Sequence, residues 1–548
     1  MANDNSQVPR DACPSPAPFN KLPAKSRKVQ SVVNLISLYF SVALSISQGI
    51  ILTPLYLKYI PPSLYGAWLA SGNVLAWICM LDPGISRILQ QRTAYMFGRG
   101  ELDKLGGVIG TGLFLGTFFA LLPLLAIPFS GNIAGMFKLV PAEHAQLTVA
   151  FTWALVSTSL MIAMYQPSAA NLGLQQGLSS GLSYSAATIA GIIITYFMLR
   201  GGSGLIALPV GMTVRALLML GFNAGWMLHW CRKNLGSKVA ISRSELRKYS
   251  TLSSFTFIER LISGLLTQSD KFIAARLISN QVAMVYSLSG CAFEPVKMGA
   301  DRLLPAFLPG LAHLSGEGNR ERLQEVCKRL MNIVAYVISV GTACVVALNF
   351  VFVKLWVGSA NFGGQKLTLM FALLTISNVL FLALAETTFA VGGVGPIEVM
   401  RAVEAVVRII LQLTLLKYLG IIGIPLGGCI GMMLVSGIYL PGISAQKLGM
   451  NRRAQYRLVA LNFLRAGVLM ACGLAVWYGL NRAAIQWTWV LFFSWSALLA
   501  LVFGAIGLAM SPAMRDEFNA VLRRLRRLKT AVPQPKSKLD LGVDIGRD

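Results

Sequence analysis

The stretch LMNIVAYVISVGTACVVALNFVFV, Leu330 to Val353, contains no charged side chain. As a helix it is long enough to cross the hydrocarbon layer of a membrane, which takes about 20 apolar residues. Runs of this kind recur along almost the whole chain of 548 residues, which is 55% hydrophobic and only 13% charged. Only helices and closed barrels satisfy their backbone hydrogen bonds in lipid, and these runs lack the alternation of barrel strands. The sequence therefore predicts an all-α polytopic membrane protein.

Fourteen apolar runs predict about fourteen transmembrane helices. They cover approximately 32–57, 64–86, 105–129, 147–170, 178–199, 204–230, 253–275, 282–310, 330–353, 367–391, 396–416, 421–440, 458–480 and 486–510. Of the 48 Lys and Arg residues, 32 lie in the two tails and the loops on their side, and 8 lie in the opposite loops. Because basic loops stay in the cytoplasm, both termini are predicted to be cytoplasmic, in a bacterial inner membrane. Anionic lipids facing these loops account for the net charge of +26 without a nucleic-acid partner.

An internal repeat organises these helices. GLIALPVG, Gly204 to Gly211, recurs as GIIGIPLG, Gly420 to Gly427, and a similar shift aligns Tyr65 with Tyr286. Six helices per repeat give two lobes of equal orientation, related by an axis along the membrane normal, with helices 13 and 14 as an accessory pair. The predicted parts are a disordered cytoplasmic tail 1–30, an N-terminal six-helix lobe 31–230, a cytoplasmic linker 231–252, a C-terminal six-helix lobe 253–440, the accessory helices in 441–510 and a basic cytoplasmic tail 511–548.

Three segments resemble a known family. They are LDPGISRILQQRTAYMFGRGELDKL from Leu81, SDKFIAARLIS from Ser269 and YLGIIGIPLGG from Tyr418, and they are similar to parts of the Wzx-type polysaccharide flippases of the MATE-like, or MOP, superfamily. Pro83 departs from the apolar residue usual in that family. The resemblance implies alternating access and the flipping of undecaprenyl-diphosphate-linked oligosaccharide for O-antigen or exopolysaccharide synthesis. Its implied partners are this lipid-linked saccharide, membrane lipids and, by analogy, a polysaccharide polymerase or other assembly proteins.

Charged residues inside the predicted spans are the candidates for substrate contact. A charge at mid-bilayer costs about 2.5–3.5 kcal/mol, so these side chains should face a wet interior or each other. A diphosphate needs compensating charge, and arginine offers paired donors for it. Salt bridging is the structural alternative, because acids and bases are equally numerous in the spans. The preferred cavity bases are Arg260, Lys271, Lys297, Arg401 and Arg408.

Other polar residues have two interpretations each. Helix 1 presents a polar face that includes Asn34 and Gln48, which either binds sugar hydroxyls or packs against a neighbouring helix. Coupling to a proton or sodium gradient is left open, and the candidate carboxylates are Glu386, Asp270 and Asp301. At the predicted cytoplasmic mouth, three charged residues either steer an anionic headgroup inward or anchor the chain at the membrane surface, namely Asp82, Arg87 and Arg92.

The alternative functions are a membrane enzyme of polysaccharide assembly, a cation-coupled multidrug antiporter of the same superfamily, and a peptidoglycan-precursor flippase. An enzyme should carry catalytic groups in a large outer loop, but the longest predicted one is about 17 residues, Ser130 to Gln146. The three histidines form no Ser/His/Asp arrangement, and no metal-ligand or cofactor motif is present. The sequence thus predicts a transporter without catalytic residues, metal site or cofactor. The resemblance around Asp82 and Gly420 favours a lipid-linked saccharide as its substrate over these alternatives.

Overall fold

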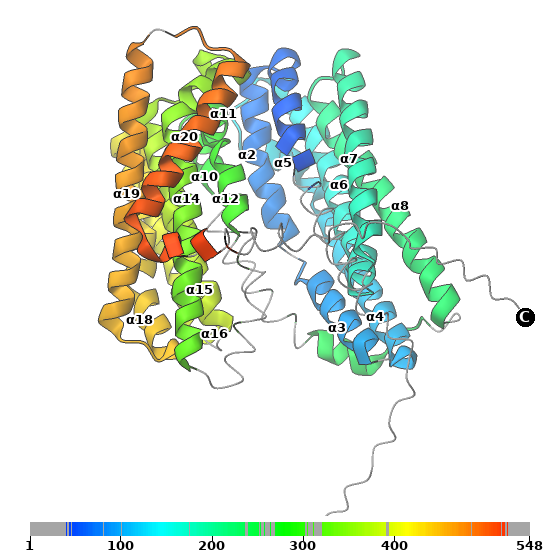
Figure 1. Cartoon of the computed structure of the whole chain (residues 1–548). Coiled ribbons are helices and arrows are strands. Elements are labelled where there is room, and N and C mark those ends of the chain that lie inside the picture. The colour runs from blue at the N-terminus through cyan, green and yellow to red at the C-terminus, as the bar shows by residue number, and fades with distance from the viewer. Residues whose placement is uncertain are drawn as a thin grey trace, which may run out of the picture. The chain divides into compact units, whose positions relative to one another are not determined.

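A computed structural model describes residues 40, 43–44, 46–80, 82–99, 101–174, 176–235, 239–250, 253, 257, 264, 269–301, 304, 311, 320–390, 394–483, 485–516, 518–520 and 523. Within these residues the chain is helical and contains no strand (Figure 1). The α-helices are α2 (Pro62–Cys79), α3 (Ile85–Arg99), α4 (Leu102–Leu121), α5 (Ser130–Ala134), α6 (Pro141–Gly173), α7 (Gly177–Arg200), α8 (Ala207–Leu235), α10 (Asp270–Leu277), α11 (Asn280–Gly290), α12 (Phe293–Asp301), α14 (Arg320–Val357), α15 (Gln365–Ala390), α16 (Val394–Leu419), α17 (Gly423–Leu434), α18 (Ser436–Leu448), α19 (Arg452–Arg482) and α20 (Trp489–Met510). Four 3-10 turns join them: η1 (Leu122–Phe129), η2 (Gly204–Ile206), η3 (Ser359–Asn361) and η4 (Gly420–Ile422).

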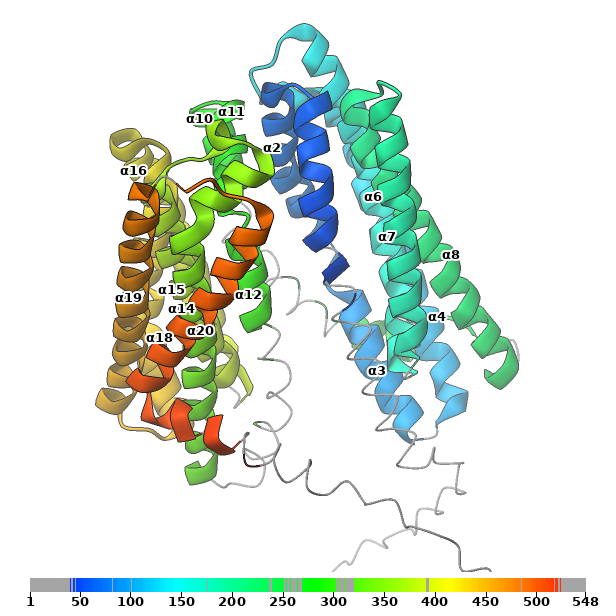
Figure 2. The same cartoon turned by 45° about the horizontal axis from the view of Figure 1, so that its top comes forward.

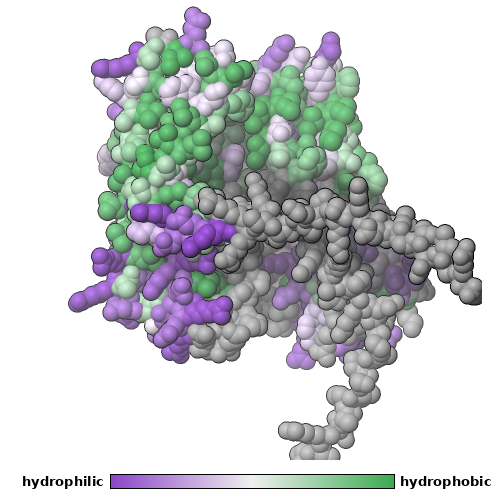
Figure 3. Space-filling view, viewed as in Figure 1, coloured by the Kyte–Doolittle hydropathy of each residue, from purple (hydrophilic) through white to green (hydrophobic). Residues whose placement is uncertain are grey.

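Nine helical stretches of the described residues are long and apolar enough to cross a membrane. Their outer surfaces are apolar as well: on α20, Val490 is 75% exposed and Leu501 is 74% exposed. Figure 3 shows hydrophobic surface along the helices and hydrophilic side chains toward their ends. Such a surface is stable against lipid and not against water. The chain is therefore a multi-pass membrane protein, as predicted, while the count of fourteen spans stays a prediction because parts of helices 1 and 7 lie outside the described residues.

Two predicted helices are interrupted next to a proline. The predicted helix 64–86 ends at Cys79, and α3 begins only after Pro83 and Gly84, whose φ of +80° favours glycine. The predicted helix 282–310 is broken between α11 and α12, where Pro295 lies in the first turn of α12 and offers no backbone N–H to the turn before it. Apolar composition located both segments but did not reveal these breaks.

The predicted outer loop Ser130 to Gln146 is shorter than the sequence suggested. Residues 130–134 form α5, and α6 begins at Pro141, which leaves residues 135–140 as the connection. Val140 is extended, with φ −68° and ψ 155°, as is usual before a proline, and Pro141 occupies the first turn of α6, where its missing N–H costs nothing.

The chain divides into two compact units. The first comprises residues 1–291, 353–370 and 398–431, and the second comprises 292–352, 371–397 and 432–548. In the first, α6, α7 and α8 run side by side (Figures 1 and 2), and a core between α3, α4, α6 and α8 encloses Leu89, Leu105 and Tyr249. In the second, α14, α19 and α20 share a core around Ala343, Leu469 and Phe503. The boundaries of the predicted lobes stay a prediction.

The repeated segments have the same local structure. Gly204 begins η2 with a φ of +55°, and Gly420 begins η4 with a φ of +58°. Each turn is followed directly by a helix, α8 or α17. Two stretches 216 residues apart thus fold alike because each opens on a glycine that accepts a positive φ. Helices α7 and α8 in the first repeat therefore correspond to α16 and α17 in the second.

Candidate functional site

Three glycines on α17 bring its backbone close to α16. Gly423, Gly427 and Gly431 recur every four residues and so lie on one face of the helix. A Cβ built on Gly427 would lie 2.6 Å from the backbone nitrogen of Gln412, and one on Gly431 would lie 2.9 Å from the Cα of Arg408. Membrane helices pack closely through such small residues. This contact fixes the position along α16 of the two polar residues, Arg408 and Gln412.

Gln412 belongs to a polar cluster around Asp270. The Nε2 of Gln412 donates to one carboxylate oxygen of Asp270 at 2.9 Å, and the Tyr286 hydroxyl donates to the other, also at 2.9 Å. Gln412 is fully buried and Tyr286 is 3% exposed, whereas Asp270 is half-buried at the first position of α10. Hydrogen bonds to a charged group are about twice as strong as neutral ones. The cluster therefore holds a carboxylate in place between α10, α11 and α16.

Arg408 lies beside this cluster, one turn from Gln412 on α16. Its side chain is only 4% exposed, its Nε has no hydrogen-bond partner, and it acts electrostatically on Tyr286. A buried guanidinium without a full set of acceptors is costly in a membrane interior. Arg408, which the sequence singled out as a cavity base, therefore has donor capacity left for an anion.

A second arginine lies in the corresponding helix pair of the first repeat, but on the other helix of that pair. Arg215 on α8 donates from Nη1 to the Oε1 of Gln48 at 3.3 Å, its guanidinium carbon lies 5.7 Å from the Tyr184 ring centroid, and its Nε has no partner. It faces Gly191 of α7, where a built Cβ would lie 3.3 Å from the Cβ of Arg215. In both repeats, then, an arginine on one helix of the pair faces a glycine on the other.

The two arginines also lie at similar depths. Arg215 follows Gly204 by eleven residues and Arg408 precedes Gly420 by twelve, which correspond to about 16–18 Å of helix from the connecting turn. That is near the middle of a hydrocarbon layer of about 30 Å. Arg215 was not among the cavity bases selected from the sequence.

Five bases within the predicted spans form no ion pair in the part of the chain that the structure describes. The charged nitrogens of five bases have no described carboxylate oxygen within 4.0 Å, namely Arg215, Lys271, Lys297, Arg401 and Arg408. Lys271 on α10, Lys297 on α12 and Arg401 on α16 are half-buried. The salt-bridge interpretation stays untested for these residues, because the side chains of Glu398 and Asp301 lie outside the described set.

The remaining predicted residues have varied positions. Gln48 is half-buried and accepts the hydrogen bond from Arg215, so this one residue of the predicted polar face contacts α8. Glu386 is half-buried on α15, where the hydroxyls of Thr387 and Thr388 donate to the Leu384 carbonyl. Asp301 is the last residue of α12, and its side chain lies outside the described set, as do Asn34 and Arg260.

The three charged residues of the predicted cytoplasmic mouth behave differently from one another. Asp82 is 3% exposed, and its Oδ1 accepts from the backbone N–H of Ile85 at 3.4 Å, at the start of α3. Arg92 forms an ion pair with Glu245, whose other oxygen accepts from Lys248 at 2.9 Å. Arg87 is exposed. Asp82 and Arg92 thus have structural contacts, and Arg87 is the freest of the three to meet a headgroup.

Sequence reasoning missed a buried amide network in the first unit. Asn171 on α6 donates to the Asn223 backbone carbonyl at 3.1 Å, and the Asn223 side chain accepts from Ser180 at 3.1 Å and donates to Ser183 at 2.8 Å. Both asparagines are at most 1% exposed. Amides and hydroxyls carry no charge, so a selection based on charged residues does not find them. The same holds for Tyr286 and Gln412.

The fold of this chain resembles those of several solved structures. An inward-facing multidrug resistance MATE family transporter of the MOP superfamily aligns with a TM-score of 0.62 and 14% identity, over 76% of this chain and 98% of that one. The lipid II flippase MurJ in an inward closed conformation aligns with a TM-score of 0.56 and 13% identity, over 87% and 99%. This chain shares their fold. The fold implied by the sequence resemblance is therefore confirmed.

A third structure, a mutant of the Vibrio cholerae MATE transporter VcmN, aligns with a TM-score of 0.56 and 12% identity, over 78% of this chain and 99% of that one. No protein-family model and no curated protein matches the sequence. The likeness is one of fold, and the transported substance must be argued from the residues of this chain.

Proposed function

We propose that the protein is a membrane transporter that moves a polyprenyl-diphosphate-linked oligosaccharide from the cytoplasmic to the periplasmic leaflet by alternating access, for polysaccharide biosynthesis. The observation that carries the proposal is the pair of arginines at similar depths, Arg215 in the first repeat and Arg408 in the second. Each retains an unbonded Nε within the described residues. A diphosphate has oxygen acceptors for both guanidinium groups.

The charge of these residues bears on the class of substrate. Arg215 and Arg408 would repel a cationic drug and would attract the diphosphate of a lipid-linked sugar. The hydroxyl and amide groups around Asn171 and Asn223 match the hydrogen-bonding chemistry of sugars, although they are already bonded to one another. One of the structurally similar proteins is a lipid II flippase, and the alignment with it covers a larger share of this chain than the MATE alignments do.

The test is flipping by the purified protein in liposomes, with a fluorescent polyprenyl-diphosphate oligosaccharide whose leaflet is read by a membrane-impermeant quencher. The double variant Arg215→Gln, Arg408→Gln should lose two charge-assisted contacts of about 1.5–3 kcal/mol each, and its affinity should fall at least about a hundredfold. Arg200→Gln, at an exposed arginine that ends α7, is the matched control and should flip normally. Full flipping by a well-folded double variant would show that the proposal is wrong.

A cation-coupled multidrug antiporter is the second candidate. The observation in its favour is the half-buried carboxylate of Asp270, held ready between Tyr286 and Gln412. Export of a cationic dye driven by an imposed inward gradient of protons or sodium ions, lost in Asp270→Asn and absent for the lipid-linked sugar, would establish this function instead. The same gradients, applied to the flipping assay, decide whether Asp270 or Glu386 couples transport to an ion.

A further inference from the structure

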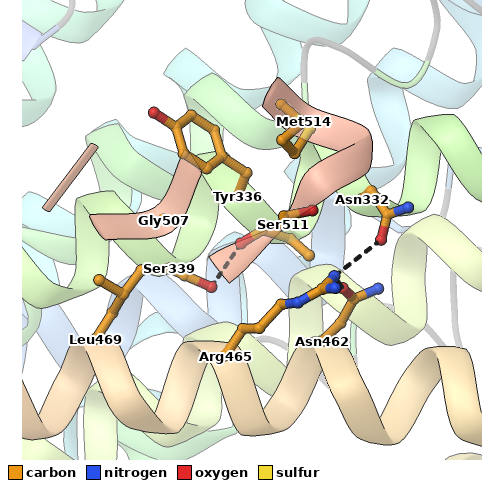
Figure 4. A pocket seen from close by; sticks show the side chains of 10 residues that line it. Asn332, Tyr336, Ser339, Asn462, Arg465, Leu469, Gly507, Ser511 and Met514 are labelled. Atoms are coloured by element: carbon orange, nitrogen blue, oxygen red, sulfur yellow. Dashed lines mark hydrogen bonds between the residues drawn. The ribbon is translucent and has the colours of Figure 1, made fainter. Parts of the chain in front are cut away.

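A pocket lies in the second unit, between α14, α19 and the residues that follow α20. It is a small pocket that opens to solvent, and its polar lining comes from Asn332, Tyr336 and Ser339 on α14, Asn462 and Arg465 on α19, and Ser511 after α20 (Figure 4). It contains none of the residues assigned to transport. The accessory helices therefore contribute a polar site of their own.

Close helix contacts build this pocket. A Cβ on Gly473 of α19 would lie 2.6 Å from the Ala343 carbonyl oxygen of α14, and one on Gly507 of α20 would lie 2.8 Å from the ring of Tyr336. The Tyr336 hydroxyl also donates to the Gly504 carbonyl at 3.1 Å. These contacts hold the three helices together on the apolar side, and the pocket opens beyond them where the side chains become polar.

The lining is rich in hydrogen-bond donors. Arg465 donates from Nη1 to Asn332 Oδ1 at 3.4 Å and to Asn462 Oδ1 at 3.2 Å, so both amide oxygens face the guanidinium. The Nδ2 of Asn462 and the hydroxyl of Ser511 have no hydrogen-bond partner, although these residues are only 1% and 3% exposed. No described carboxylate lies within 4.0 Å of Arg465. Buried donors without acceptors are costly, and an anion would satisfy them.

The pocket also lies where the spans meet the polar zone. Ser511 directly follows the last residue of α20, and Asn332 and Asn462 lie ten or more residues into helices that begin at arginines, Arg320 and Arg452. In Figure 3 the hydrophobic surface over α19 gives way to hydrophilic side chains toward the end of the bundle where α18 lies. Arg515, four residues beyond Ser511, donates to the Ala509 carbonyl at 3.4 Å and adds positive charge near this end of α20. The pocket thus lies at the end of the α20 span, beside basic residues of the kind that attract anionic lipid headgroups.

We propose that this pocket binds the phosphate group of an anionic phospholipid, held by Arg465 and by the free donors of Asn462 and Ser511. An arginine offers two parallel donors to phosphate oxygens. The phosphate would complete the hydrogen bonds that the side chains leave open, and the acyl chains would lie along the exposed apolar face of α19 and α20. The bound lipid would fasten the accessory helices to α14.

The test is native mass spectrometry of the full-length protein released from detergent, with added phosphatidylglycerol, phosphatidylcholine or inorganic phosphate. Phosphatidylglycerol should remain bound to the wild-type protein, and Arg465→Gln should weaken its retention about tenfold or more, as expected for one lost charge-assisted contact. Arg457→Gln, two turns earlier on an exposed part of α19, is the matched control and should retain the lipid. Ser511→Ala removes one donor with little risk to folding and should weaken retention to a smaller degree.

Equal retention of phosphatidylglycerol by wild-type, Arg465→Gln and Ser511→Ala proteins would overturn the proposal. Binding of inorganic phosphate that depends on Arg465, without any retained lipid, would overturn the assignment to a phospholipid. Equal retention of phosphatidylcholine would overturn the preference for an anionic headgroup. None of these results bears on the flipping assay, because Arg465 and Ser511 lie in a different unit from Arg215 and Arg408.

Discussion

Adding one methyl group at Gly427 should disturb the cluster around Asp270. The new Cβ would lie 2.6 Å from the Gln412 backbone nitrogen, and an ordinary contact needs at least 3.4 Å, so α16 and α17 must separate by about 0.8 Å. If Gln412 moves with its backbone, its 2.9 Å hydrogen bond to Asp270 stretches to about 3.7 Å, which is no longer a hydrogen bond.

The free energy of unfolding should fall accordingly. Losing a hydrogen bond to a charged group costs about 1.5–3 kcal/mol and overpacking costs about 1–3 kcal/mol, whereas replacing a helical glycine by alanine gains about 0.5–1 kcal/mol. The net loss in Gly427→Ala is about 1.5–5.5 kcal/mol. Thermal unfolding of the purified protein in detergent, followed by tryptophan fluorescence, measures it as a lower Tm.

The matched control is Gly221→Ala on α8, where a Cβ meets nothing within 4 Å. This variant should be as stable as the wild-type protein or slightly more stable. Equal unfolding temperatures for Gly427→Ala and the wild-type protein would refute the argument that the glycine contact positions Gln412.

Two further predictions concern single residues. Tyr286→Phe removes the 2.9 Å hydrogen bond to Asp270 and should lower the free energy of unfolding by about 1.5–3 kcal/mol. Tyr439→Phe, at a tyrosine that is 61% exposed, should leave the free energy of unfolding unchanged. Equal losses in the two variants would contradict a specific role of Tyr286. Gly204→Ala and Gly420→Ala should each destabilise the protein by about 1–2 kcal/mol, since both force alanine to a positive φ, and a clear loss at one position with none at the other would contradict their structural equivalence.

Apolar runs in the sequence predicted the fold class because the membrane imposes a length and a composition on every span. The repeat of GLIALPVG as GIIGIPLG predicted a duplication into two lobes, which stays a prediction, while Gly204 and Gly420 have similar positive φ angles. The interruption between α2 and α3 was not predicted, because the mean hydropathy of residues 64–86 is dominated by their apolar side chains and does not reveal the effect of Pro83 and Gly84. Helix breaks depend on individual backbone groups and not on the mean composition of a segment.

Only the charged residues of the candidate site could be selected from the sequence. Asp270 and Arg408 were selected from separate helices because charges stand out in apolar runs, but nothing in the sequence placed both beside Tyr286. Gln412 and Tyr286 are uncharged, and their importance follows from contacts between residues up to 142 positions apart. Such contacts depend on tertiary packing, here on Gly427 and Gly431, and not on local pattern.

The distance along the chain between Asp270 and Gln412 also has a consequence for biosynthesis. A ribosome adds about 5–20 residues per second, so Gln412 is made about 7–28 s after Asp270. During that interval α10 must be held near or in the membrane while one of the two donors of its carboxylate does not yet exist. We therefore expect the insertion machinery, or water at the membrane surface, to stabilise α10 and the charge of Asp270 during this interval. This support is needed until α16 and α17 are made and complete the first unit.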